Sequence, residues 1–174
     1  MKRAFDPDRI LRDLLASGRD GEHFDMRIDS RGQWFHEGRR IERIELVRLF
    51  STILRKADDG SYWLVTPVEQ GRIEVEDVPF VLLELALEGE TGCNGQIIRL
   101  RSNTDEWVTI DDRHPLVMRE RSHGGGLAPY VTIRDRLEGR VDRAVFYEMA
   151  DMAVEHEGEI GVWSCGTFHV LGAR

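Results

Sequence analysis

The sequence predicts an α+β protein made of two similar units, each a helix joined to a mainly antiparallel sheet. Apolar residues recur at helical spacing near the start of the chain and again within 41–63 and 141–163. Short apolar runs separated by turn-forming residues fill the middle, as is typical of strands. The two 23-residue stretches 41–63 and 141–163 both end in tryptophan. No regular βαβ alternation occurs, which favours antiparallel pairing.

The chain is predicted to begin with a helix and a β-hairpin. Residues 6–17 carry four apolar side chains at helical spacing, and Asp6 before Pro7 suits the start of a helix. Residues 24–29 and 33–38 flank Ser30-Arg31-Gly32, a turn in which the glycine can take a positive φ. This order predicts a helix followed by two paired strands.

A second helix is predicted within 41–63. Its apolar stripe consists of Leu46, Val47, Phe50, Ile53 and Leu54. Gly60 can end the helix, and residues 61–67 are typical of a strand that stops at Pro67.

The stretch 141–163 repeats this pattern at an offset of 100 residues. Its apolar positions are Phe146, Tyr147, Ala150, Ala153 and Val154, and Asp142 is a suitable N-cap. Identity is limited to Arg43 with Arg143 and Trp63 with Trp163, and Glu-Gly precedes both stretches, at 37–38 and 138–139. Self-similarity at a fixed spacing indicates a duplicated unit.

The middle of the chain is predicted to be rich in strands. Residues 71–78 alternate apolar and charged side chains, which indicates a strand with one solvated face. Residues 79–87 are almost continuously apolar and predict a strand buried on both faces, although a buried helix fits as well. Four further strands are expected at 96–102, 106–110, 115–121 and 129–135.

Composition excludes several classes of function. The 174 residues carry a net charge of −8, which argues against binding a nucleic-acid polymer or an anionic membrane. The longest apolar run, 78–83, is far shorter than a membrane span. The start of the chain does not have the apolar core of a secretory signal, and Cys93 and Cys165 are expected as free thiols, so a cytoplasmic location is predicted.

Arginine placement suggests anion binding, but a second interpretation stays open. The pairs Arg99/Arg101, Arg119/Arg121 and Arg134/Arg136 have i, i+2 spacing, which puts both members of a pair on one face of a strand. If the strands are neighbours, the guanidinium groups form a cradle for phosphate or carboxylate. Alternatively, they are exposed side chains that pair with nearby acids.

No catalytic or metal-binding motif is complete. The segment His-Gly-Gly-Gly at 123–126 resembles an esterase oxyanion loop, but the Gly-x-Ser-x-Gly motif is absent. Neither phosphate-loop nor dinucleotide-binding glycine motifs occur, and the histidine spacings do not suit zinc. Arg113 and His114, in a polar turn before Pro115, either aim at one ligand or simply form that turn. We therefore expect no cofactor and no defined catalytic residue.

The segment 34–80 resembles the bacterial domain of unknown function 1285 family, and "DDRHPL" at 111–116 with 129–153 fits the same resemblance. The resemblance implies a duplicated α+β core, a C-terminal half superficially similar to pleckstrin-homology folds, and a ligand site between the halves. It also implies a nucleotide-like ligand and a part in signal transduction. With the repeat it gives an expected division into 1–22, an N-terminal helix and linker, 23–80, the first repeat, and 81–174, the second.

The leading hypothesis is a ligand-binding or sensory protein with a cleft between two repeats for a small anionic, nucleotide-like molecule. Its expected contacts are Arg43, Trp63, Arg113, His114, Arg134, Arg136, Arg143 and Trp163. Both tryptophans are most simply explained as core anchors, and stacking on a ligand ring is the alternative. One alternative is a protein interaction module that uses the acidic segment 57–98. Another is a hydrolase or transferase in which His36 or His114 acts with a carboxylate.

Overall fold

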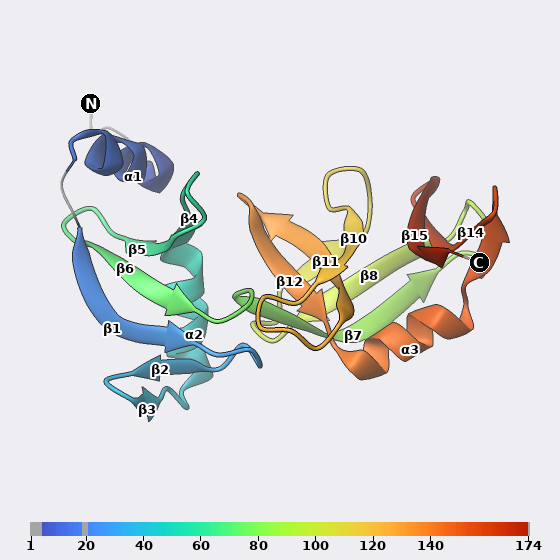
Figure 1. Cartoon of the computed structure of the whole chain (residues 1–174), viewed down its shortest axis with the longest axis horizontal. Helices are drawn as coiled ribbons and strands as arrows, with labels where there is room; N and C mark the ends of the chain where they lie inside the picture. Colours follow the sequence, from blue (N-terminus) through green and yellow to red (C-terminus); the bar gives the residue numbers. More distant parts are fainter. Residues whose placement is uncertain (1–4, 19–20, 174) are drawn as a thin grey trace. The chain divides into compact units, whose positions relative to one another are not determined.

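The computed structural model describes residues 5–18 and 21–173 and has the predicted α+β fold. Two compact units are present, Met1–Glu76 and Asp77–Arg174, and both are built mainly from antiparallel strands (Figure 1). No helix in the described part of the chain is long and apolar enough to cross a membrane.

The first unit is a six-stranded sheet with two helices. Its elements are α1 (Pro7–Ala16), β1 (Glu22–Ile28), β2 (Trp34–His36), β3 (Arg39–Arg40), α2 (Ile44–Ile53), β4 (Leu54–Lys56), β5 (Tyr62–Val65) and β6 (Gln70–Val75). The strand order is β3-β2-β1-β6-β5-β4. All neighbours are antiparallel except β1 and β6, which run parallel.

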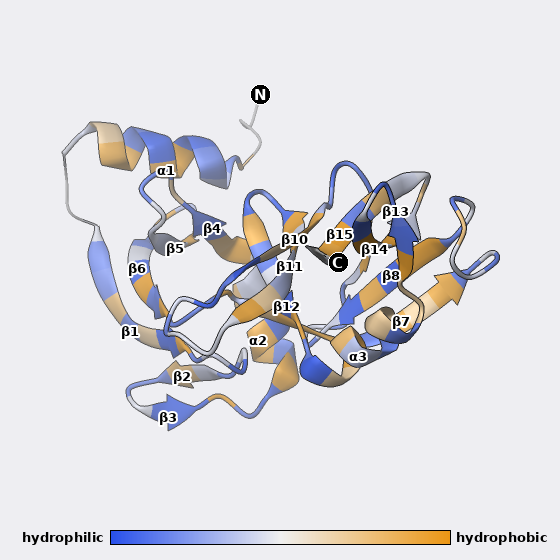
Figure 2. Ribbon diagram, turned by 45° about the vertical axis from the view of Figure 1, so that its right-hand side comes forward, coloured by the Kyte–Doolittle hydropathy of each residue, from blue (hydrophilic) through white to orange (hydrophobic). Residues whose placement is uncertain are grey.

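The two helices of the first unit follow their sequence signals closely. Asp6 caps α1 by accepting a hydrogen bond from the Arg9 backbone, and α1 is amphipathic, as the mixed orange and blue colouring in Figure 2 shows. Leu11 of α1 packs against Trp63 in a small core cluster. The second helix is shorter than expected, because Leu54 begins strand β4 and pairs with Leu64 instead of forming another helical turn.

The second unit contains a six-stranded sheet, one helix and a three-stranded sheet. Its elements are β7 (Phe80–Glu88), β8 (Ile97–Ser102), β9 (Trp107–Thr109), β10 (Leu116–Glu120), β11 (Leu127–Arg134), β12 (Leu137–Val141), α3 (Arg143–Asp151), β13 (Val154–His156), β14 (Glu159–Ser164) and β15 (Thr167–Ala173). The larger sheet has the order β10-β11-β12-β7-β8-β9, with β12 and β7 parallel. The smaller sheet has the order β13-β14-β15.

Strand β7 is a strand, as expected, but it is not buried along its whole length. Phe80, Val81 and Leu82 are buried, whereas Leu83 is 52% exposed and the rest is exposed or half-buried. The continuous apolar run is therefore a strand of which only the N-terminal end is buried in the core.

Both six-stranded sheets have the same topology, which supports duplication. In each sheet, two three-stranded meanders meet where the first strand of one lies parallel to the last strand of the other. A glycine in that last strand permits close packing. A Cβ on Gly71 would lie 2.3 Å from the Phe24 ring, and one on Gly139 would lie 3.1 Å from Leu82. Hence each glycine is covered by a side chain of its parallel neighbour.

The stretches 41–63 and 141–163 contain similar elements, but they do not hold matching places in the duplicated sheets. Each contains a helix and the beginning of a three-stranded meander, and each final tryptophan lies in the middle strand, β5 or β14. In the first unit α2 lies between the two meanders of the six-stranded sheet, whereas α3 follows both meanders of the second and leads into the separate three-stranded sheet.

Buried polar side chains join the two sheets of the second unit. Ser164, which is fully buried, donates to the Ile110 carbonyl at 2.6 Å and accepts from the Ile98 N–H at 3.0 Å. Gln96 donates to the Trp163 carbonyl at 2.9 Å. Because buried polar groups are costly when unpaired, these bonds fix the position of β14 against β8.

Candidate anion-binding site

A pocket of about 370 Å³ lies in the second unit where the β10–β11 loop, β11, the end of β12 and the first turns of α3 meet. Its lining residues are Arg121, Gly125, Leu127, Ala128, Pro129, Arg140, Val141, Arg143, Phe146 and Tyr147. Three of these are arginines and none is acidic. We call it the arginine pocket.

The glycine-rich segment 123–126 forms one rim of the arginine pocket. Arg121 and Gly126 close the loop through an N–H to carbonyl bond of 3.2 Å, and Gly124 donates to the Arg121 carbonyl at 3.1 Å. Gly124, Gly125 and Gly126 all have positive φ values, which suit glycine and strain other residues. A Cβ at Gly125 would also lie 3.4 Å from Arg121 Nη1. The glycines therefore allow the loop to turn back beside the Arg121 side chain.

The buried carboxylate of Asp77 holds the Arg140 side chain in place. Arg140 Nε lies 3.3 Å from Asp77 Oδ2, and the Asp77 side chain is only 4% exposed. Tyr130 Oη donates to Asp77 at 2.9 Å, and Ser122 Oγ donates to it at 3.0 Å. Burial, followed by the hydrogen bond to Asp77, raises the pKa of Tyr130 to about 12, so its hydroxyl stays a donor. Asp77 thus offsets the charge of Arg140 and fixes its position.

Arg121 and Arg143 have a different environment. Arg143 is the first residue of α3, and its Nε donates to Tyr147 Oη at 2.8 Å, one helical turn away. The Arg143 guanidinium carbon is also 5.4 Å from the centre of the Tyr147 ring. Among the residues that the structure describes, neither Arg121 nor Arg143 forms an ion pair. Two positive charges therefore face the pocket without an acidic partner.

The remaining wall of the pocket is apolar and partly solvent-exposed. Leu127 is 64% exposed and Tyr147 52%, while Phe146 is half-buried. Large apolar side chains beside guanidinium groups suit a ligand with an anionic group and an apolar or planar body.

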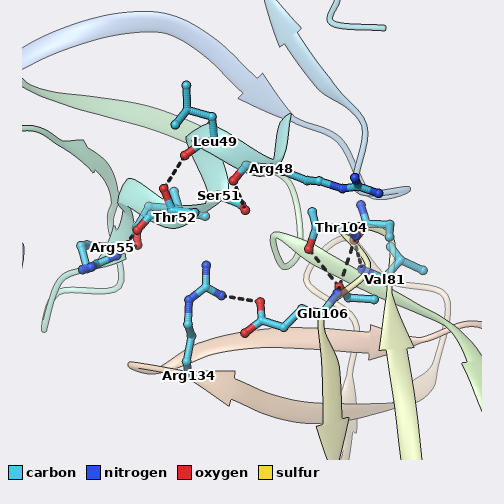
Figure 3. A network of polar contacts seen from close by, with 12 residues as sticks. Arg48, Leu49, Ser51, Thr52, Arg55, Val81, Thr104, Glu106 and Arg134 are labelled. Atoms are coloured by element: carbon cyan, nitrogen blue, oxygen red, sulfur yellow. Dashed lines mark hydrogen bonds and ion pairs between the residues drawn. The ribbon is translucent and has the colours of Figure 1, made fainter. Parts of the chain in front are cut away.

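The structure places the other predicted contacts elsewhere. Arg134, at the end of β11, forms an ion pair of 2.8 Å with Glu106 (Figure 3), and its guanidinium carbon is 5.2 Å from the Phe80 ring. Arg136 is exposed in the β11–β12 turn with a φ of 68°. That turn and Arg143 lie beyond opposite ends of β12, which at about 3.3 Å per residue is roughly 13 Å from first to last Cα. Arg134 and Arg136 are therefore not brought together with Arg143.

Arg113 and His114 lie in a compact turn before β10. Asp111 Oδ1 accepts the backbone N–H groups of both residues at 2.9 Å and lies 3.0 Å from His114 Nδ1. Burial alone would raise the pKa of Asp111, but the hydrogen bonds from the turn outweigh burial and lower it. The contacts explain the turn by itself, and Arg113 is exposed.

The two tryptophans have different surroundings. Trp63 is 4% exposed and packs with Leu11, Ala57 and Val65, which confirms the core-anchor interpretation for this residue. Trp163 is half-buried and lies edge-on to His156 and Phe168, at ring-centre distances of 4.8 and 5.2 Å. Arg43 is exposed immediately before α2. Arg43 and Trp63 belong to the first unit and the other expected contacts to the second, and the cleft between repeats stays a prediction.

The paired arginines do not form one cradle. Strand β8, which carries Arg99 and Arg101, is separated from β11 by β12 and β7. Arg99 pairs with Glu88 and Arg101 with Glu84, so the solvated-face interpretation holds for this pair. Arg119 pairs with Glu138 at 3.0 Å and stacks on Tyr130. Of this set, Arg121 alone lines the arginine pocket.

The sequence named Arg121 only as a member of the paired-arginine cradle, and it did not indicate Arg140 as a site residue. The run of glycines at 124–126 was a usable signal for Arg121, because glycines allow a loop to approach a neighbouring side chain closely. Nothing in the sequence placed Asp77 against Arg140, since the two are 63 positions apart. In the described part of the chain, no group of three or more His, Cys, Asp or Glu side chains is placed to hold a metal ion.

Comparison with known proteins identifies relatives without a stated activity. Residues 18–78 match the family model "Domain of unknown function (DUF1285), N-terminal domain", and residues 79–171 match "Protein of unknown function (DUF1285), C-terminal domain". No curated protein matches the chain significantly.

Two crystal structures of DUF1285 family proteins are similar to the chain. The one from Silicibacter pomeroyi DSS-3 has 33% identity and a TM-score of 0.81, and covers 92% of this chain and 94% of its own. The one from Shewanella baltica OS155 has 22% identity and a TM-score of 0.56, and covers 74% and 92%. The second likeness concerns the fold alone.

Proposed function

The chain belongs to the DUF1285 family, and from the geometry of its second unit we propose that it binds a small anionic ligand in the arginine pocket. The observation that carries the proposal is the gathering of Arg121, Arg140 and Arg143 around one pocket that has no acidic residue in its lining, while Asp77 pairs with Arg140. Guanidinium groups present paired donors that match phosphate and carboxylate oxygens.

The contacts that the pocket offers indicate how strongly a ligand could bind. Each hydrogen bond from a charged group contributes about 1.5–3 kcal/mol. Two such contacts and the burial of a ring against Phe146 and Tyr147 sum to about 5–9 kcal/mol before the costs of association and ordering are subtracted, so these contacts predict a weak complex. Because a volume of about 370 Å³ lies near the lower end for small-molecule sites, the ligand is small.

The proposal includes the finer expectations drawn from the sequence. A nucleotide-like compound fits the required chemistry, since it joins phosphate to a planar ring that can lie against Tyr147. A sensory role in signal transduction, a pleckstrin-homology-like character of the second unit and a cytoplasmic location remain part of the proposal.

Two other functions receive less support. Five acids of the segment 57–98 pair with arginines, namely Asp59, Glu76, Asp77, Glu84 and Glu88, so a protein partner would not meet a bare acidic face. His114 is within hydrogen-bond reach of Asp111, as the hydrolase hypothesis requires, but that carboxylate also caps the turn.

Thermal unfolding with a panel of small anions tests the proposal. Nucleoside phosphates, inorganic phosphate and dicarboxylates are compared at equal ionic strength, with the unmodified protein and with Arg121→Gln and Arg143→Gln. We expect at least one anion to raise the unfolding temperature, and both substitutions to remove that shift. Arg113→Gln, which makes the same charge change at an exposed turn, is the control. The proposal fails if no anion stabilises the protein, or if Arg113→Gln removes the shift equally.

A further inference from the structure

We propose that the arginine pocket selects a doubly charged phosphate monoester attached to an apolar or aromatic group. This inference rests on the proposed function and specifies the ligand's charge and chemical class. It follows from the number of positive charges in the pocket that lack an acidic partner and from the position of the apolar wall beside them.

The charge count begins with Arg140. Its positive charge is offset by Asp77, which is held in place by Tyr130 and Ser122 and is almost completely buried. The Arg140 side chain is itself only 13% exposed. This pair contributes hydrogen-bond donors to the pocket but little net charge.

Arg121 and Arg143 supply the uncompensated charge. They approach the pocket from the β10–β11 loop and from the start of α3, and neither forms an ion pair within the described part of the chain. The Arg143 Nε is used by Tyr147, which leaves its terminal nitrogens for a ligand. A ligand with two negative charges neutralises this pair, whereas a monoanion leaves one guanidinium unmatched. Each charge pair at about 4 Å is attractive even in a well-hydrated setting.

The apolar side of the pocket narrows the class further. Leu127, Phe146 and Tyr147 line the same pocket as the guanidinium groups, and Leu127 and Tyr147 are largely exposed. Free inorganic phosphate would leave these side chains in water. A phosphate monoester on a ring or a short apolar chain would cover them, and covering apolar surface adds affinity.

Phenyl phosphate and phenyl sulfate form a matched pair of probes. They have nearly the same shape, but the phosphate is a dianion at pH 7.5 and the sulfate is a monoanion. We expect titration calorimetry at pH 7.5 to show at least about tenfold tighter binding of phenyl phosphate. Arg143→Gln, by removing one unmatched charge, should reduce this ratio to about threefold or less. Arg113→Gln should leave it unchanged.

The pH dependence gives a second readout. The second pKa of a phosphate monoester is about 6, so only about a tenth is dianionic at pH 5. Affinity for phenyl phosphate should fall about five- to tenfold between pH 7.5 and pH 5, because the remaining monoanion binds at most about a tenth as tightly, while affinity for phenyl sulfate stays constant or rises. The charged and titratable groups around the pocket are Arg121, Arg140, Arg143, Tyr147 and, behind Arg140, Asp77. Phenyl sulfate keeps its own charge over this range, so it controls for any change in the protein, including the rim loop with His123.

The outcomes separate the two proposals. If neither probe binds and no other anion stabilises the protein, the proposed function itself is wrong. If both probes bind with equal affinity at both pH values, the pocket binds anions but does not select a dianion, and only the present inference is overturned. Tighter binding of inorganic phosphate than of phenyl phosphate would overturn the part assigned to the apolar wall.

Discussion

Replacing Asp77 is expected to destabilise the second unit and, at the same time, to strengthen anion binding. Asp77 lies three residues before the start of β7, and its side chain is 4% exposed. It accepts hydrogen bonds from Tyr130 and Ser122 and pairs with Arg140. Asp77→Asn keeps the shape and an acceptor oxygen but removes the charge. Arg140 then keeps its positive charge in a largely buried position without the carboxylate that offsets it.

The structure gives the magnitude. Breaking a buried ion pair by removing one partner costs about 3–5 kcal/mol. Asparagine still accepts from Tyr130, and Arg140 retains 13% exposure, so Asp77→Asn should cost less, about 1.5–3 kcal/mol, as for the loss of a hydrogen bond to a charged group. Asp77→Ala should reach about 3–5 kcal/mol, and the double substitution Asp77→Ala with Arg140→Met should be less destabilising than Asp77→Ala alone.

Urea unfolding, monitored by hydrogen exchange, provides the assay. Exchange measured in peptides of β11 and β12 reports on the second unit separately, which matters because a chain with two units need not unfold in one step. Calorimetry with phenyl phosphate measures the affinity of the same variant. A loss below about 0.5 kcal/mol for Asp77→Ala, or weaker anion binding by a folded Asp77→Asn, would show that the pair does not have the role inferred from its burial.

Two further predictions concern the three-stranded sheet. Gly161→Ala should destabilise the protein by about 1–3 kcal/mol, because the new Cβ would lie 2.3 Å from the His169 carbonyl oxygen. Gly172→Ala on the neighbouring strand meets nothing within 4 Å and should change stability by less than about 0.5 kcal/mol. Urea unfolding of both variants tests this, and equal effects would contradict the steric argument. Burial lowers the pKa of His169, against the opposing charges of Asp112 and Asp111. The folded state therefore binds this proton less readily than the unfolded state, and stability should be complete above pH 6.5 and decline as the pH falls below it, by at most about 1.4 kcal/mol per pH unit. His169→Gln should remove that part of the decline, and an unchanged pH profile would exclude His169 as its source.

Local features were predictable because they depend on neighbours in the sequence. The Asp6 and Asp142 caps, the hairpin at 30–32 and the strand at 61–67 all follow from residue type and short spacing, and the structure confirms them. The sequence allowed the second helix to continue to Gly60, but α2 ends at Ile53. Leu54 has helical spacing, yet it pairs with Leu64 in a strand instead. The periodicity of a segment indicates which of its side chains can share a face. It gives no information on whether another strand will pair with that segment.

Long-range placement was much less predictable. Of the three i, i+2 arginine pairs, only Arg99/Arg101 lies within one strand. Arg121 follows the end of β10 and Arg136 is in the β11–β12 turn, and the order of strands separates β8 from β10 and β11. The pairing of Asp77 with Arg140 depends on β7 lying parallel to β12, a contact that no local pattern reveals. The arginine pocket could be suspected from Arg143 and the glycine run, while its charge balance required the structure.

Comparison of the two duplicated sheets explains why the pocket belongs to the second unit. Arg72 and Arg140 each follow the glycine of the parallel strand pair, Gly71 or Gly139. Arg72 is half-exposed, pairs with Asp59 at 3.5 Å and lies over the Trp63 ring, so its charge is satisfied at the surface. After Arg140, by contrast, the chain continues directly into α3 and brings Arg143 to the same place.

Because α3 follows β12 directly, Arg140 lines a pocket as well as packing beside the parallel strands. Each sheet uses the same glycine-arginine step to close its parallel strands, but only the second has a helix that begins immediately afterwards. Replacing either glycine by a larger residue should disturb the packing of its sheet, since each is covered by a neighbouring side chain, more closely at Gly71 than at Gly139. Exchanging the arginines would not be equivalent: Arg72→Gln should leave anion binding unchanged, whereas Arg140→Gln should weaken it, because only Arg140 lines the pocket that α3 completes.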